Sequence, residues 1–249
     1  MALLGACIGS FLNVCLYRWK NGGQVVSPSS FCPHCKKTIL WFDNIPIVSF
    51  FLLMGKCRSC HRPISWQYPM VEFTTAFLFY LSSVKFLGQN TNLLFSSLVF
   101  STFLILLVAS DLKWWMLPHL FNNLFILTGL LFSPKSIIDY PSIAFNSAAN
   151  FVLLFIPFVA LTLLFPNGFG GGDVKMVAGL SIWLGFNKSI LVLFLSFVAG
   201  SFVILPLLIL KKISLKTPIR FGPFLGLGSM GVWFWPDFFC RQIFSLTLG

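Results

Sequence analysis

Acidic side chains are scarce in this chain: Asp and Glu together number 6 among 249 residues, against 17 Lys and Arg. Charged residues of both signs make up only 9% of the sequence, whereas hydrophobic residues make up 57%. Because a soluble domain carries about 25% charged residues, this composition excludes an ordinary soluble protein and predicts a polytopic membrane protein. Chemistry that needs carboxylates has only these candidates: Asp43, Glu72, Asp111, Asp139, Asp173 and Asp237.

Long apolar runs predict an all-α fold with about eight transmembrane helices. The runs cover residues 2–17, 70–88, 93–111, 116–133, 141–165, 174–187, 189–210 and 218–236. The first has about 16 residues, slightly fewer than the ~20 that cross a bilayer, so either its true start lies upstream or the helix is short. We expect a first helix at 1–17, a polar domain at 18–67, a second helix and loop at 68–92, a membrane core at 93–210, and a last helix with the C-terminus at 211–249.

Basic residues are distributed unequally between the loops on the two sides of this topology. With the loops assigned alternately, 13 of the 17 Lys and Arg residues fall on the side of the 18–67 domain. Basic loops stay in the cytoplasm, so this domain is expected to be cytoplasmic and the N-terminus periplasmic. Orientation against anionic membrane lipid also explains the net charge of +11 without a nucleic-acid partner.

Two CxxC pairs lie in the polar domain, Cys32-Pro-His-Cys35 and Cys57-Arg-Ser-Cys60, with 21 residues between them. This spacing is typical of a zinc ribbon, in which each pair supplies two thiolates to one tetrahedral ion. Two disulfides or a redox pair are the alternative, which the reducing cytoplasm disfavours. His34 and His61 could each replace a ligand. The apolar stretch 45–54 is too short to cross the membrane, so we expect it on the membrane surface or packed under the zinc domain.

The sequence Gly170-Gly171-Gly172-Asp173 interrupts two long apolar runs. One interpretation is structural: the glycines end one helix and Asp173 caps the next. The other is functional, because glycines allow another backbone to approach closely and ionisable groups near membrane depth are candidates for function. Asp111 ends the third predicted helix at the same cytoplasmic edge. Two such carboxylates can share a proton and activate a water, as in aspartic proteases.

These features resemble those of the type IV prepilin peptidases, polytopic GxGD aspartic proteases of bacterial inner membranes. The matching stretches are Gly9-Ser10-Phe11-Leu12-Asn13-Val14, Tyr17-Arg18, Asn44-Ile45-Pro46, Ser49, Gly55, both CxxC pairs, Ile64-Ser65-Trp66, Tyr68-Pro69, Val71-Glu72, Asp111, Leu117-Pro118, Gly170-x-Gly172-Asp173-x-Lys175 and Phe221-Gly222-Pro223-Phe224. The resemblance covers nearly the whole chain. One departure is His119, where many relatives carry an acid.

The resemblance implies an activity and a set of site residues. Such enzymes cleave a basic leader from type IV prepilins and type II secretion pseudopilins, then N-methylate the new terminus with S-adenosylmethionine. Asp111 and Asp173 would be the catalytic pair, and Gly170, Gly172 and Lys175 would belong to the GxGD loop. A presenilin-like intramembrane protease is the nearest enzymatic alternative, a proton-coupled transporter is a more distant one, and a non-enzymatic zinc-ribbon scaffold would leave the GxGD loop unexplained.

The sequence also suggests roles for the other acids and for each member of the pair. Glu72 and Asp43 are the remaining acids on the cytoplasmic side, so they are candidates to contact the basic leader, although Glu72 can simply complement its helix N-terminus. Asp111 is expected at a helix C-terminus, whose field disfavours ionisation, and Asp173 at an N-terminus, whose field favours it. We therefore expect Asp111 to hold the shared proton and Asp173 to accept one from water.

Overall fold

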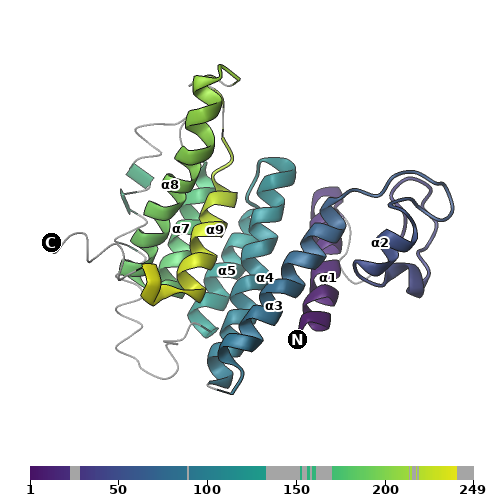
Figure 1. Cartoon of the computed structure of the whole chain (residues 1–249), viewed down its shortest axis with the longest axis horizontal. Coiled ribbons are helices and arrows are strands. Elements are labelled where there is room, and N and C mark those ends of the chain that lie inside the picture. Colours follow the sequence, from purple (N-terminus) through teal and green to yellow (C-terminus); the bar gives the residue numbers. More distant parts are fainter. Residues whose placement is uncertain are drawn as a thin grey trace. The chain divides into compact units, whose positions relative to one another are not determined.

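The computed structural model describes residues 1–22, 29–88, 90–132, 170–212 and 219–239, together with a few isolated positions between 152 and 217. Helices dominate these residues (Figure 1), and no strand occurs among them beyond two isolated β-bridges. The elements are α1 (Ala2–Asn21), η1 (Trp41–Asn44), α2 (Val48–Leu52), α3 (Gln67–Phe86), α4 (Thr91–Trp114), α5 (His119–Phe132), α7 (Gly171–Leu184), α8 (Phe186–Ile209) and α9 (Gly222–Phe234). The expected all-α fold is therefore confirmed for the described part of the chain.

Three of these helices, α1, α4 and α8, are long and apolar enough to cross a membrane, and α5 is apolar but shorter. On α8 even large apolar side chains are open, with Phe202 77% and Ile209 78% exposed. Lipid covers such surfaces at little cost, whereas water does not. The chain is a helical membrane protein on this evidence. The count of about eight spans stays a prediction, since the run at 141–165 lies almost entirely outside the described residues.

The first helix is one turn longer than expected. We expected the basic residues Arg18 and Lys20 to stop it after residue 17, but α1 continues through both to Asn21. Lys and Arg are good helix formers and are favoured in a last turn, so they do not end the helix. Gly22 ends it instead: it adopts φ 70° and donates its N–H to the carbonyl of Arg18, as in a left-handed C-cap.

The chain divides into two compact units, Met1–Ala109 and Ser110–Gly249. In the first unit α1 packs against α3. The approach is close because glycines line it: a Cβ on Gly9 would lie 2.7 Å from the Cα of Glu72. Asn13 of α1 donates its side-chain N–H to the carbonyl of Tyr68. Small residues and polar side chains are the usual means of joining membrane helices. Here they hold together the two helices on either side of the polar domain with the four cysteines, which we call the cysteine-rich domain.

In the second unit α7 is the central helix and contacts α5, α8 and α9. Its residues from Val174 to Trp183 are buried except for Lys175. Gly179 lies against the ring of Phe125, where a Cβ would be 2.6 Å from the ring. Trp183 donates its indole N–H to the carbonyl of Phe125 at 2.9 Å. These contacts hold α5 and α7 together, and Asp173 stands at the start of this central helix.

Candidate active site and metal centre

Asp111 lies in the last turn of α4 and is 7% exposed. The helix runs three residues past the expected boundary at 111 and ends at Trp114. Trp115 then adopts φ 57° and donates its N–H to the carbonyl of Asp111 at 3.0 Å. Across the unit, the N–H of Gly222 at the start of α9 donates to Asp111 Oδ2 at 3.2 Å. Asp111 is thus a buried carboxylate at a helix C-terminus, held by a backbone donor from another helix.

Asp173 occupies the third position of α7, not the cap that the structural interpretation gave it. Gly170 is the N-cap residue, because the glycines allow the helix to begin one turn earlier. The carbonyl of Gly170 accepts the N–H of Asp173 at 3.0 Å, and Asp173 Oδ2 accepts the N–H of Gly170 at 3.3 Å. The carboxylate therefore completes the helix start from within the first turn and lies beside an exposed glycine turn, so the cap assignment was wrong and the functional interpretation stays a prediction.

The loop that follows Asp111 holds the glycine turn that precedes Asp173. Gly172 lies directly on Leu117: a Cβ there would be 2.6 Å from the Cβ of Leu117. Asn122 of α5 is fully buried and donates its side-chain N–H to the carbonyl of Gly172 at 3.2 Å. The two aspartates interact electrostatically as a result. All of these groups belong to the second unit, so the candidate pair forms within one compact body.

Two neighbours of the pair were not assigned a role from the sequence. Asn122 could have been found as an amide inside an apolar helix, where an unpaired polar group is costly. Arg220 lies 109 residues after Asp111 in the sequence, yet its Nη1 donates to the carbonyl of Leu112 and its guanidinium lies 4.1 Å from the centre of the Trp115 ring. Only its position two residues before Gly222 connects it to a motif, and nothing in the local sequence points to α4.

Lys175, which the resemblance assigns to the GxGD loop, points to the neighbouring helix. Its Nζ donates to Nδ1 of His119 at 3.2 Å. His119, the position at which this chain departs from many relatives, is therefore in contact with a residue of the GxGD motif. The start of α5 is therefore connected to the start of α7 by two hydrogen bonds, one from Lys175 to His119 and one from Asn122 to Gly172.

The four cysteines of the polar domain converge on one point. Their sulfur atoms all lie within 4.8 Å of one another, with Cys32 Sγ and Cys60 Sγ 3.9 Å apart. Tetrahedral zinc with Zn–S bonds of about 2.3 Å requires sulfurs about 3.8 Å apart, so the cluster fits zinc. None of the six described cysteines forms a disulfide. Backbone N–H groups of Cys60 and Ser59 lower the pKa of the Cys57 thiol to about 7. The N–H of Arg62 lowers the pKa of the Cys60 thiol, but desolvation and the neighbouring thiols outweigh it and raise that pKa to about 11. Cys57 is therefore the first of the two to offer the thiolate that a metal binds.

The two CxxC turns repeat each other in backbone detail. Each ends in a residue with positive φ, Lys36 at 61° and His61 at 55°, which donates its N–H to the carbonyl of the first cysteine at 2.9 Å. An antiparallel bridge closes each turn, Phe31 with Thr38 and Lys56 with Pro63. The sequence shows the CxxC spacing that the two turns share, and the structure adds the shared hydrogen bonds and dihedral angles.

The histidines beside the cysteines do not belong to the sulfur cluster. Nδ1 of His34 lies 3.2 Å from Nη1 of Arg62, and the metal-ligand group contains only the four cysteines among the described residues. The short apolar stretch at 45–54 forms α2, whose Phe50 is buried and lies 4.8 Å from the ring of Trp66. Phe50 therefore packs within the cysteine-rich domain, whereas Phe51 and Leu52 are 60% and 75% exposed, so the placement of that exposed side on the membrane surface stays a prediction.

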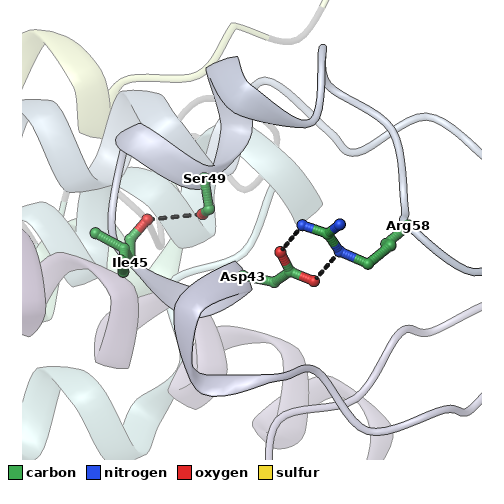
Figure 2. Close-up of polar contacts among 4 residues, drawn as sticks. All are labelled: Asp43, Ile45, Ser49 and Arg58. Atoms are coloured by element: carbon green, nitrogen blue, oxygen red, sulfur yellow. Dashed lines mark hydrogen bonds and ion pairs between the residues drawn. The ribbon is translucent and has the colours of Figure 1, made fainter.

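Both acids that were candidates for leader contact have partners within the first unit. Asp43 forms a bidentate pair with Arg58, both bonds being 2.7 Å, beside the bond from Ser49 to the carbonyl of Ile45 (Figure 2). The Arg58 guanidinium lowers the pKa of the Asp43 carboxyl. Glu72 is 7% exposed and its Oε2 accepts the N–H of Ile47 at 2.7 Å. Their contact with a substrate stays a prediction, since each would have to share or exchange these partners.

Helices long enough to span a membrane, a four-cysteine cluster and two aspartates at adjoining helix ends fit the class of membrane-embedded aspartic peptidases. Residues 3–86 match the family model of the bacterial peptidase A24 N-terminal domain, and residues 98–205 match that of the type IV leader peptidase family. The chain belongs to the type IV leader peptidase family.

Curated relatives agree with this assignment over nearly their full length. A prepilin leader peptidase/N-methyltransferase of Aeromonas hydrophila is 30% identical over 96% of this chain and 91% of its own. The protein of the same name from Legionella pneumophila is 31% identical over 95% of this chain and 91% of its own length. The one from Bacillus subtilis is 28% identical over 99% of this chain and 98% of its own length. No solved structure matches this chain.

Proposed function

We propose that this protein cleaves the basic leader peptide from type IV prepilins and type II secretion pseudopilins and then N-methylates the new N-terminal residue. Family membership and the names of the relatives support both activities. The observation that supports the cleavage step is the contact between Leu117, in the loop that follows α4, and Gly172, the residue before Asp173. Asp111 and Asp173 are the proposed catalytic residues.

Cleavage proceeds by acid and base catalysis at the pair. One carboxylate takes a proton from a water as its oxygen attacks the scissile carbonyl, and the other carboxyl gives its proton to the carbonyl oxygen. Burial serves this chemistry because electrostatic interactions are stronger where water is excluded. No covalent intermediate is needed, since the attacking group is water.

The glycine turn is the proposed approach for the substrate backbone. Gly170 and Gly171 are exposed, and nothing lies within 4 Å of a Cβ built on Gly171. An extended peptide can therefore come close to the backbone beside Asp173 with no side chain in the way. Gly172 differs from these two glycines, because it packs against Leu117 and is not open to a substrate.

The proposed topology has about eight membrane spans in the bacterial inner membrane, with the N-terminus in the periplasm. The excess of basic residues on one set of loops supports a cytoplasmic position for the cysteine-rich domain and the catalytic pair. Prepilin leaders are basic, and the strongly positive face of the enzyme needs local acids to receive them. Glu72 and Asp43 are the candidates on that side.

The two proposed small-molecule partners are zinc and S-adenosylmethionine. Cys32, Cys35, Cys57 and Cys60 would hold one zinc ion, which would fix the fold of the cysteine-rich domain and leave no open position for catalysis. S-adenosylmethionine would supply the methyl group. The transferase activity rests on the relatives' name alone, since no residue described here marks the donor's site.

Mass spectrometry of one reaction tests both activities. Purified protein is incubated with a prepilin peptide that contains the leader junction, in the presence and absence of S-adenosylmethionine. We expect a shortened peptide in both reactions and a further gain of one methyl group only with the donor. An intact peptide in both would contradict the peptidase assignment, and a shortened peptide without the methyl group would contradict the transferase assignment alone.

A further inference from the structure

Arg220 is bound to the C-terminal end of α4, the helix end that carries Asp111. Its Nη1 donates to the carbonyl of Leu112, one of the four carbonyls that a helix C-terminus leaves without an intrahelical partner. Its guanidinium is stacked 4.1 Å from the centre of the Trp115 ring, the first residue beyond the helix. Two different contacts therefore fix the cation at this point.

This position changes the field that acts on Asp111. A free helix C-terminus has a partial negative charge of about half a unit, which disfavours a second negative charge. A full positive charge bound to the same carbonyls more than offsets it. The N–H of Gly222, two residues after Arg220, donates to Asp111 Oδ2 at 3.2 Å. The same short segment thus brings both a cation and a backbone donor to Asp111.

Within the ranges that the structure describes, no cation is bound beside Asp173 in a comparable way. Its carboxylate accepts one backbone N–H, from Gly170, and faces the negative charge of Asp111. The nearest basic residue in the sequence, Lys175, donates to His119 instead. The other basic residue close to Asp111, Lys113, lies with its Nζ 5.0 Å from the Trp114 ring. Among the described residues, Arg220 is therefore the charge that distinguishes the two aspartates.

We propose that Arg220 is a positioning residue that keeps Asp111 ionised, so that Asp111 takes the proton from water and Asp173 holds the proton that it gives to the scissile carbonyl. This assignment rests on the proposed peptidase function and reverses the one expected from the helix ends alone. The partial negative charge at the C-terminus of α4 was the basis for expecting Asp111 to be protonated, and the positive charge of Arg220 offsets that partial charge.

Each turnover returns both aspartates to their initial protonation states. Water gives a proton to Asp111 as its oxygen bonds to the carbonyl carbon, and Asp173 protonates the carbonyl oxygen to form a gem-diol. One hydroxyl of the gem-diol then returns a proton to Asp173 as the carbonyl re-forms. The C–N bond breaks, and the leaving amine takes the proton from Asp111. Both aspartates end in the states in which they began.

One further feature of Arg220 fits this role. Its Nε is buried and has no acceptor within the described ranges of the chain. A guanidinium N–H buried without a partner is costly, and it pairs best with a carboxylate or another oxyanion. Within the described residues, Nε therefore keeps one N–H for an oxyanion.

The pH dependence of cleavage tests the proposal, with Arg220→Gln, Arg220→Lys and the control Lys113→Gln. Removal of the cation should make Asp111 harder to ionise, so the low-pH limb of kcat/KM should move to higher pH by about one unit in Arg220→Gln. Activity one unit below the wild-type midpoint should then fall about tenfold. Arg220→Lys should restore most of the shift, because the charge stays. Lys113→Gln removes a cation from the same helix end and should keep the wild-type profile.

The outcomes separate a charge effect from a structural one and from failure of the proposed function. An unchanged limb in Arg220→Gln, or equal shifts in Arg220→Gln and Arg220→Lys, would overturn the proposal. The pH profile reports the titration of the two aspartates as a pair, so infrared spectra are needed to tell which aspartate is protonated. A protonated-carboxyl band should survive in Asp111→Asn and be lost in Asp173→Asn. The reverse pattern contradicts the assignment. If instead both Asn variants cleave normally, the peptidase mechanism itself is wrong.

Discussion

Replacement of Gly172 by Ala should change the spacing of Asp111 and Asp173, whereas the same change at Gly171 should leave that spacing intact. A Cβ on Gly172 would lie 2.6 Å from the Cβ of Leu117 and 3.3 Å from its carbonyl oxygen. Ordinary carbon contacts are about 3.5–4.0 Å, so roughly 1 Å of overlap must be relieved. Leu117 cannot relieve it by a change of rotamer, because its Cβ is fixed to the backbone. Either the Leu117 loop or the start of α7 must move.

That movement separates Asp111 from Asp173, because each aspartate is attached to one side of the contact. A misplacement of about 1 Å between catalytic groups costs on the order of 100-fold in rate, so we expect kcat to fall roughly 100-fold in Gly172→Ala with a smaller change in KM. Overpacking should also destabilise the fold by about 1–3 kcal/mol.

Gly171→Ala is the matched control. Its Cβ meets nothing within 4 Å, and Ala is about 1 kcal/mol better than Gly inside a helix, so stability should hold or rise. Because Gly171 lies on the proposed substrate approach, Gly171→Ala should raise KM, whereas kcat at saturating substrate should stay near the wild-type value. Initial rates of peptide cleavage at saturating substrate, with the melting temperature of each variant in detergent, give both quantities. A Gly172→Ala enzyme within threefold of Gly171→Ala would refute the claim that the Leu117 contact sets the spacing of the pair.

Three further predictions concern the metal, the leader and the Asn122 contact. Cys57→Ser should lower bound zinc from about one per chain to near zero, and should harm methyl transfer more than cleavage; metal analysis under reducing conditions that finds no zinc in the wild type would count against the site. Glu72→Gln keeps an acceptor for the Ile47 N–H and should weaken binding of a basic leader more than of a neutralised one; equal affinities would leave Glu72 only its internal bond. Asn122→Leu removes the donor to Gly172 and should lower kcat by about tenfold at least. Asn122→Asp should not restore the rate, because a carboxylate cannot donate a hydrogen bond. Wild-type kinetics in Asn122→Leu would show that the bond is dispensable.

The candidate pair could be predicted from the sequence because acids are so few. Asp111 and Asp173 were the only two that lay between long apolar runs on the predicted cytoplasmic side, and the structure places Asp111 in the last turn of α4 and Asp173 in the first turn of α7. The four cysteines were predictable for a similar reason, since their spacing has few uses. In both cases a rare residue type in a fixed pattern limits the possible structures.

What the sequence could not supply are contacts between residues distant in the chain. Arg220 meets the end of α4 only after α8 and α9 have folded back against α7, and no local pattern encodes that return. The extent of α1 was misjudged because charge was taken as the end of a helix, whereas the backbone conformation of Gly22 decides it. The start of α7 was misplaced because Asp is a good N-cap, yet the preceding glycines allowed an earlier start.

Cleavage by the single Asn variants tests the central claim most directly. Asp111→Asn and Asp173→Asn each remove one ionisable oxygen with little change in shape, and an amide can neither accept the proton from water nor donate one as a carboxyl does. Purified, membrane-inserted variants are incubated with the prepilin peptide and the products are read by mass spectrometry beside the wild type. The account predicts intact peptide with either variant and cleaved peptide with the wild type. Cleavage near the wild-type rate by either variant would remove that aspartate from the mechanism.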